Sequence, residues 1–244
     1  MPVSQSYPQA RLAEHVRACR IGDQIIFLDL REGRYLGVGG AQAPALCAAI
    51  FGPWATDDRQ DAPANADLPA EWLRRLRRRR LLSDAPAAET AQALPELPEP
   101  TAGLTLDEGA GDVDFEWRHL VRLWQATFVT AAWLRRYSLA DIATRVAALR
   151  ARHCGTGDRL AVDATHVAVE VYARLRPFAL TAHDRCLNDS LALIHFLATQ
   201  GLFARWVIGV RVHPFGAHSW VQRGGVVLND LPERVRHYQP ILVV

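Results

Sequence analysis

The change from a helical to a strand pattern lies in residues 186–212, which read CLNDSLALIHFLATQGLFARWVIGVRV. Residues 186–200 are apolar on most sides, which is typical of a buried helix, and Gly201 is the kind of residue that commonly follows a last helical turn. After Gly201 apolar residues recur at every second position, which indicates a strand. Further strand patterns follow at 217–221 and 226–228. Helices followed by an antiparallel sheet predict an α+β domain.

Three helical patterns precede that stretch, and an acidic segment precedes them. Apolar residues at three- and four-residue spacing predict helices at 117–137, 139–153 and 161–175. With the strands they make up a predicted domain at 117–244, which carries 16 Arg and 8 acidic residues. Residues 83–116 carry nine acidic residues and no basic one, and they are rich in Ala and Pro. This composition predicts a linker that builds no core of its own.

Residues 1–82 show a different pattern, in which short strands come first. Turn residues separate three β-rich runs, and helical segments follow at 41–51 and 69–82. The strands are predicted at 15–20, 24–30 and 34–38. Three strands followed by helices are the content of a winged-helix-like module.

The composition excludes several chemistries. All 28 basic residues are Arg, so the chain has no Walker-type phosphate lysine, no Schiff-base lysine and no Ser-Lys dyad. HExxH, GxSxG, CxxC and Gly-rich phosphate motifs are absent from the sequence, so we expect neither a metal site nor a cofactor. Nothing approaches 18 consecutive apolar residues, and the first residues lack a signal-peptide pattern. We therefore expect a cytoplasmic protein without a membrane partner.

Cys186 stands at the start of the predicted buried helix, with Asp184 as a candidate N-cap. The positive end of a helix dipole and its free N–H groups lower the pKa of a thiol and could hold an oxyanion. This position makes Cys186 a candidate nucleophile. The alternative is a core cysteine on an apolar helix.

A thiolate nucleophile needs an imidazole partner and an acid that orients the imidazole, and the predicted strands supply His218 and Asp230. The alternative is a structural histidine and a turn aspartate. If residues 223–225 form a three-residue hairpin loop, His218 lies directly opposite Asp230 on one face. A two-residue loop would pair Asp230 with Ser219 and send the two side chains to opposite faces. We therefore expect the loop length and the His–Asp pair to depend on each other.

Three runs together resemble the transglutaminase-like cysteine peptidase of lasso peptide biosynthesis. They are Cys-Leu-x-x-Ser-Leu-Ala-Leu from Cys186, Ala-His-x-Trp around His218 and Val-Leu-Asn-Asp ending at Asp230. The resemblance covers residues 117–244 and implies a papain-like fold. It also implies an endopeptidase that removes the leader from a ribosomally made precursor with a Cys-His-Asp triad. Papain-like enzymes often place a Gln before the Cys, but residues 179–185 contain none, so the second oxyanion donor is unassigned.

The N-terminal part resembles the small recognition element that is fused to this peptidase in some lineages. The residues that carry this resemblance are Ile26, Leu28, Asp29, Gly33, Arg34 and Tyr35. The resemblance implies that the leader binds as an added strand beside the third strand and against the last helix. In this sequence those positions are Tyr35, Leu36, Gly37, Val38, Arg74, Arg77, Arg78 and Leu81. The implied partners are the precursor peptide and a macrolactam cyclase resembling asparagine synthetase.

Six of the seven residues from 74 to 80 are Arg. This run is open to three interpretations: a solvated helix face, a contact with acidic groups of a leader or of the linker, or a helix that enters the major groove of DNA. The third would make the chain a DNA-binding regulator with an inactive transglutaminase-like sensor domain. Cys186, His218 and Asp230 favour the peptidase, because an inactive sensor needs none of them, and no nucleic acid partner is expected.

Overall fold

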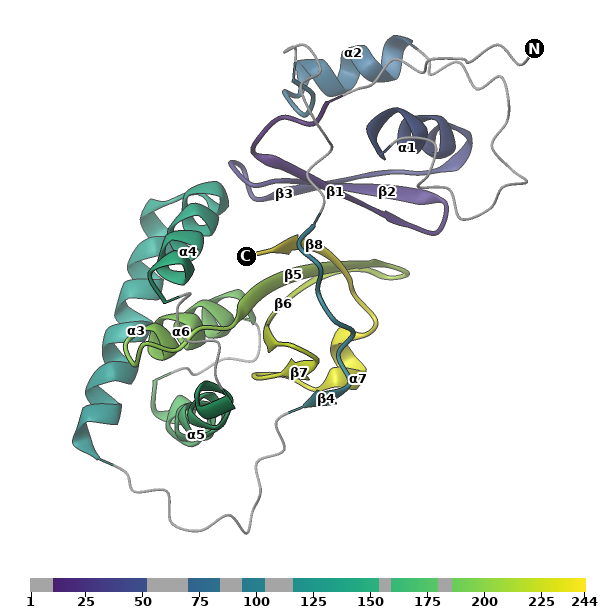
Figure 1. Cartoon of the computed structure of the whole chain (residues 1–244). Coiled ribbons are helices and arrows are strands. Elements are labelled where there is room, and N and C mark those ends of the chain that lie inside the picture. The colour runs from purple at the N-terminus through teal and green to yellow at the C-terminus, as the bar shows by residue number, and fades with distance from the viewer. Residues whose placement is uncertain (1–10, 52–69, 84–93, 104–115, 154–158, 180–185) are drawn as a thin grey trace. The chain divides into compact units, whose positions relative to one another are not determined.

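The computed structural model describes residues 11–51, 70–83, 94–103, 116–153, 159–179 and 186–244 (Figure 1). The chain divides into two compact units, Met1–Ala93 and Leu94–Val244.

The N-terminal unit contains a three-stranded antiparallel sheet in the order β1-β2-β3. Its strands are β1 (Val16–Ile21), β2 (Gln24–Asp29) and β3 (Arg34–Val38), as predicted. A two-residue turn joins β1 to β2, and Gly22 adopts a φ of 58° there, a conformation that tight hairpins require. β3 pairs only with β2 among the described strands, so it is an edge strand.

Within the described residues of this unit, the strands are followed by α1 (Ala43–Phe51) and α2 (Ala70–Arg78). Phe27 of the sheet, Leu46 of α1 and Leu76 of α2 belong to one buried apolar cluster. This content confirms the predicted order of three strands followed by helices.

The helix predicted to run to residue 82 ends earlier, at Arg78. Arg80 takes a φ of 57°, and its N–H donates to the carbonyl of Arg77 at 2.8 Å. The Leu81 N–H donates to the carbonyl of Leu76 at 3.0 Å, which completes a Schellman motif. The chain turns back here because Leu81 and Leu82 are then buried in the core instead of continuing along an exposed, Arg-rich helix.

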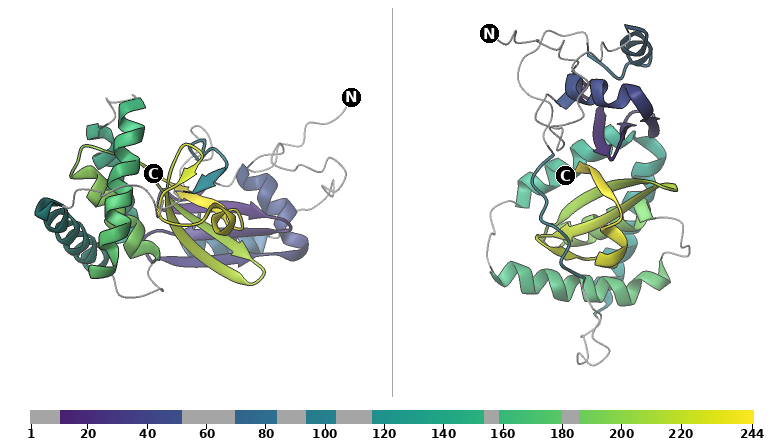
Figure 2. Two further views of the ribbon diagram at one scale, coloured as in Figure 1. Left: turned by 90° about the horizontal axis from the view of Figure 1, so that it is seen from below. Right: turned by 90° about the vertical axis from the view of Figure 1, so that its right-hand side faces the viewer.

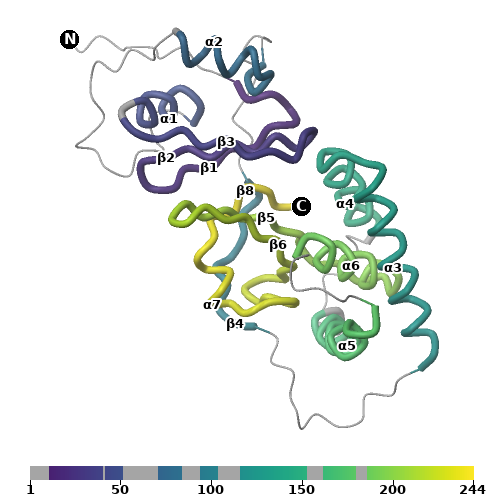
Figure 3. Tube along the Cα trace, turned by 180° about the vertical axis from the view of Figure 1, so that it is seen from behind, coloured from purple at the N-terminus to yellow at the C-terminus, as the bar shows by residue number. Residues whose placement is uncertain are grey.

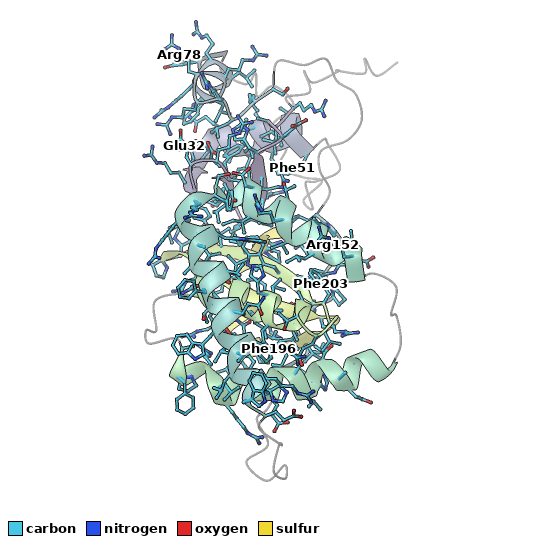
Figure 4. All side chains as sticks on the ribbon, turned by 90° about the vertical axis from the view of Figure 1, so that its left-hand side faces the viewer. Glu32, Phe51, Arg78, Arg152, Phe196 and Phe203 are labelled. Carbon is cyan, nitrogen blue, oxygen red and sulfur yellow. The ribbon has the colours of Figure 1, made fainter. Side chains whose placement is uncertain are left out.

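The C-terminal unit contains helices that match the predicted pattern. They are α3 (Trp117–Arg136), α4 (Leu139–His153), α5 (Arg159–Leu175) and α6 (Cys186–Ala198). α6 lies between α3 and strand β6 of the sheet, and α4 and α5 also contact it (Figure 3). Phe196 of α6 is fully buried and lies among these helices (Figure 4). Packing against these neighbours buries residues 189–197 of α6 and holds in place the helix that begins at Cys186.

A five-stranded sheet in the order β4-β7-β6-β5-β8 has these helices on one face (Figure 2). Its members are β4 (Ala102–Gly103), β5 (Arg205–Val212), β6 (Phe215–Arg223), β7 (Val226–Val227) and β8 (Gln239–Val243), and a short helix α7 (Pro232–Val235) precedes β8. The sequence patterns had indicated β5, β6 and β7 only. The described helices include none with the length and apolar character needed to cross a membrane.

Residues 94–103 belong to the sequence predicted as a linker, yet they lie along the C-terminal unit (Figure 1). β4 pairs in parallel with β7, and the Gln222 side chain donates to the carbonyl of Pro98 at 2.6 Å. Leu94 and Leu97 pack on the apolar cluster around Trp220. The segment has too few apolar residues for a core of its own, but it covers the core of another part of the chain. The neighbouring residues 84–93 and 104–115 lie outside the described part.

The register of the β6–β7 hairpin differs from the prediction. Gln222 pairs with Val227 and Arg223 pairs with Val226, so the loop has two residues instead of three. Gly224 adopts a φ of 57°. Two consecutive glycines can make the tight turn that residues with a β-carbon disfavour.

Candidate active site

Cys186 is the first residue of α6 and is partly exposed. The residues of α6 that follow the first turn are buried. The main-chain carbonyl of Cys186 accepts a hydrogen bond from the Ser190 hydroxyl at 2.7 Å. The predicted N-cap, Asp184, lies outside the described residues. The structure therefore places Cys186 at a helix N-terminus, where the first N–H groups have no intrahelical acceptor.

The surroundings of Cys186 favour its thiolate. Burial raises the pKa of the thiol, but hydrogen bonds from the His218 side chain and from the N–H groups of Ser219 and Leu187 lower it further than burial raises it. The net result is a pKa below the ordinary value of a cysteine. By contrast, burial raises the pKa of Cys19 to about 12 and also raises the pKa of Cys47.

His218 and Asp230 form a close pair. Nε2 of His218 lies 2.5 Å from Oδ2 of Asp230, and both side chains are largely buried. Burial lowers the pKa of His218, but hydrogen bonds with Asp230 and Cys186 raise it to about 9. Burial raises the pKa of Asp230, yet the His218 contact brings it below its usual value. The three groups together favour a thiolate, an imidazolium and a carboxylate.

Two aromatic rings flank the imidazole of His218. The Trp220 ring is nearly parallel to it, with centroids 6.3 Å apart, and the Tyr238 ring lies at 5.2 Å. Gly209 is the cross-strand partner of His218. A β-carbon at Gly209 would lie 2.7 Å from the Trp220 ring and 2.9 Å from Cβ of Tyr238. A glycine is therefore needed opposite His218 to leave space for both rings.

His218 and Asp230 form a pair although the β6–β7 loop has two residues. The prediction that this pair requires a three-residue loop is therefore wrong. The regular ladder ends at Val227, and the chain bends over residues 228–230. The Leu228 N–H still donates to the carbonyl of Val221 at 2.9 Å. The Val221 N–H, however, donates to the side-chain oxygen of Asn229 at 2.8 Å. Strict alternation of faces holds only within a ladder, so Asp230 can reach His218 beyond its end.

A cavity of about 1060 Å³ opens at these residues. Its lining includes Cys186, His218 and Asp230, and Trp124 and Phe128 of α3 form another part of its wall. The exposed fractions of these two aromatic side chains are 52% and 77%. The sequence analysis did not single out this wall, because in α3 the aromatic residues fit an ordinary amphipathic pattern.

Asp189 is a second residue that the sequence analysis missed. It is 7% exposed and lies on α6 beside the cavity. Its carboxylate accepts hydrogen bonds from Tyr172 and Asn229 and forms an ion pair with Arg176. Asn229, the partner of Asp189, directly precedes Asp230 in the Leu-Asn-Asp run. This adjacency was the only signal in the sequence that could have pointed to Asp189.

The residues predicted to bind a leader all lie in the N-terminal unit. Tyr35, Leu36, Gly37 and Val38 form most of the edge strand β3, and Arg74, Arg77 and Arg78 are exposed on α2. Arg78 projects from the outer side of α2 (Figure 4). Val38 and Leu81 are 2% and 4% exposed, so their side chains belong to the core. Leu81 also follows the helix instead of forming part of it.

The described residues contain no cluster of three or more His, Cys, Asp or Glu side chains that could hold a metal ion. Cys154, a further cysteine of the chain, lies outside the part that the structure describes.

Comparison with known proteins gives a family for the C-terminal unit. Residues 124–243, which include Cys186, His218 and Asp230, match the family model of the transglutaminase-like superfamily. The C-terminal unit therefore contains a transglutaminase-like domain. The chain is also similar to the microcin J25-processing protein McjB of Escherichia coli, with 51% identity over 47 residues. This match covers 19% of the chain and 23% of the relative, so it spans about a quarter of the relative's length. No solved structure matches the chain.

Proposed function

We propose that this protein is the leader peptidase of a lasso peptide pathway. It binds the leader of a ribosomally made precursor and cleaves the bond between leader and core before the macrolactam closes. The observation that carries the proposal is Cys186 at the N-terminus of a buried helix, next to the His218–Asp230 pair and open to a cavity. The similarity to a protein named for processing microcin J25 supports the same substrate class.

In the proposed reaction, the Cys186 thiolate attacks the carbonyl carbon of the scissile peptide bond. His218, held as an imidazolium by Asp230, donates its proton to the leaving amine, so the core departs with a free α-amino group. The leader stays as a thioester on Cys186. His218 then takes a proton from water, the hydroxide attacks the thioester, and the leader leaves as a carboxylic acid while the thiolate returns. The acid then loses its proton to solvent.

The tetrahedral intermediate carries a negative oxygen that needs hydrogen-bond donors. We assign one donor to the N–H of Cys186, because the first N–H groups of α6 point out of the helix without acceptors inside it. The Leu187 N–H already stabilises the thiolate.

We assign leader binding to the N-terminal unit. β3 is an edge strand, and its outer N–H and C=O groups can accept an added strand of the leader. The exposed Arg side chains of α2 can then pair with acidic leader residues. Binding the leader in one unit raises the effective concentration of the scissile bond at the other. The released amine is the group that a macrolactam cyclase requires, which makes such an enzyme the expected partner.

One observation favours a second candidate function. The side chains of Arg74, Arg75 and residues 77–80 are all exposed, as a DNA-binding helix would need. In that case residues 1–82 would bind duplex DNA tightly, and rising salt would weaken the binding. The assembled Cys186, His218 and Asp230 favour the peptidase, because a DNA-binding regulator has no use for them.

The test of the peptidase is incubation with a candidate precursor peptide followed by mass analysis. We expect two products, a leader with a free carboxylate and a core with a free amine, and we expect neither with the Cys186→Ala variant. Intact precursor after incubation with the full chain and a cyclase would contradict the proposal.

A further inference from the structure

The side chain of Asn229 makes hydrogen bonds to both strand β6 and helix α6. Its Oδ1 accepts from the Val221 N–H at 2.8 Å. Its Nδ2 donates to Oδ2 of Asp189 at 3.0 Å and lies 3.2 Å from the Ser190 hydroxyl. The side chain therefore joins strand β6 to the buried helix α6, directly beside the segment that carries Asp230.

The bond to Val221 replaces a bond of the sheet. In an antiparallel pair, opposite residues exchange two hydrogen bonds, and Leu228 donates the first of them to Val221. The second would join the Val221 N–H to the carbonyl of Leu228, but the Asn229 side chain takes that N–H instead. The ladder stops at this point, so the chain can leave the register that would direct Asp230 away from His218.

Asp189 holds the other end of Asn229. Its Oδ1 accepts from the Tyr172 hydroxyl at 3.0 Å and pairs with Nε of Arg176 at 3.1 Å. Its Oδ2 is thereby directed to the Asn229 amide. Tyr172 is 1% exposed, so this carboxylate is anchored from the interior of the helical layer.

We propose that Asn229 is a positioning residue, which Asp189 holds so that it ends the β6–β7 ladder and turns Asp230 onto His218. This inference rests on the proposed catalytic roles of His218 and Asp230. Asn229 itself contacts neither the thiol nor the imidazole in any described interaction. Asn229 acts on the site indirectly, by setting the backbone direction of residues 228–230 and so the orientation of Asp230.

The inference predicts a change that loss of stability alone would not produce. When Asp230 no longer faces His218, the imidazolium loses the hydrogen bond that raises its pKa to about 9. In the Asn229→Ala variant the His218 titration should therefore move toward its ordinary value near 6.5. The alkaline limb of kcat/KM should move to lower pH with it, and the rate at pH 8 should fall about tenfold or more.

We would measure the titration in the full chain from the imidazole signals of ¹⁵N-histidine NMR spectra. The chain has nine histidines, and a His218→Gln spectrum identifies the signal of His218. The matched control is Thr101→Ala, which removes a side-chain hydrogen bond to the carbonyl of Gly225 in the loop of the same hairpin. We expect the control to lower stability without moving the His218 titration. A His218 titration that is the same in Asn229→Ala and wild type would overturn the proposal.

A charge swap tests the link to Asp189 and covers the case in which Asn229→Ala does not fold. Asn229→Asp alone places a second carboxylate beside that of Asp189. The two should repel each other, so residues 228–230 should no longer direct Asp230 toward His218. Asp189→Asn combined with Asn229→Asp again pairs one amide with one carboxylate at these two positions. We therefore expect the double variant to recover most of the raised pKa of His218. A double variant no better than Asn229→Asp would overturn the role of Asp189. Because the titration needs no substrate, it can succeed even if the precursor is not cleaved, and the two failures stay distinct.

Discussion

Nε2 of His218 lies 2.5 Å from Oδ2 of Asp230, and only 13% and 12% of the two side chains are exposed. Cys186 hydrogen-bonds to the same imidazole. Because Nε2 faces Asp230, the other ring nitrogen is the one left for the thiol. One imidazole therefore connects the carboxylate to the sulfur, and each of the three groups can be tested by substitution.

Cys186→Ala should abolish precursor cleavage and leave both the fold and leader binding unchanged, because the side chain is small and partly exposed. Mass analysis of the products and a leader-binding titration measure the two effects. Cys47→Ala is the control, since its thiol is buried and its pKa is raised. Cys19 and Cys154 should also be dispensable for the reaction. Peptidase activity that survives in Cys186→Ala would refute the assignment of the nucleophile.

Asp230→Asn should preserve folding but reduce kcat/KM by roughly 10²–10⁴-fold, because an amide can orient the imidazole without offsetting its positive charge. The pKa of His218 should fall from about 9, so the alkaline limb of the pH profile should move to lower pH. A turnover equal to that of wild type across the pH range would contradict this role.

The His218–Asp230 pair should also contribute stability that depends on pH. The pKa of His218 is raised in the folded chain, so this contribution is fully present below about 6.5 and is lost as the pH rises through about 9. Urea unfolding at pH 6 and pH 10 measures it. The difference in stability between wild type and Asp230→Asn should be larger at pH 6, and an equal difference at both pH values would argue against a charged pair.

Gly209→Ala should destabilise the C-terminal unit by about 1–3 kcal/mol, because the new methyl group overlaps the Trp220 ring. Activity should fall as well, since the ring would have to move beside His218. Gly216→Ala is the control on the neighbouring strand, where the nearest atom belongs to the flexible Arg211 side chain. Thermal unfolding distinguishes the two variants, and equal effects would mean that space opposite His218 is not limiting.

Phe128→Ala should raise KM for the precursor by roughly tenfold, which corresponds to about 1.4 kcal/mol of binding free energy, with little change in kcat. We expect this because Phe128 lines the cavity beside Cys186 and its side chain is largely exposed to solvent. Trp117→Ala is the matched control, an aromatic residue of the same helix that is equally exposed but absent from the cavity lining. If both variants have the same KM, the peptide does not use this wall.

A C-terminal fragment that begins at residue 94 should be more stable than one that begins at residue 117. The longer fragment keeps β4 and the hydrogen bond from the Thr101 N–H to the carbonyl of Gly225 at 2.8 Å. It also keeps the apolar cover that Leu94 and Leu97 provide. Urea midpoints of the two fragments test this, and equal midpoints would show that residues 94–103 add no stability.

The sequence by itself determined the elements that local patterns encode. The three N-terminal strands, the helix from Leu139 to His153 and the buried helix from Cys186 all follow from periodicity and turn residues. It also singled out Cys186, His218 and Asp230, because the chemistry of a thiol nucleophile calls for those residue types. What these residues do in catalysis stays a prediction.

The tertiary structure decided where those patterns stop. The α2 helix ends at Arg78 because burial of Leu81 and Leu82 outweighs the continuation of a helical pattern. Residues 94–103 lie against a distant part of the chain, and no local pattern reports a contact across more than 120 residues. The approach of Asp230 to His218 depends on Asn229 and Asp189, which are 40 residues apart. Alternation along a strand cannot show that a side chain will replace a main-chain hydrogen bond, because that exchange depends on which groups the folded chain brings beside the strand.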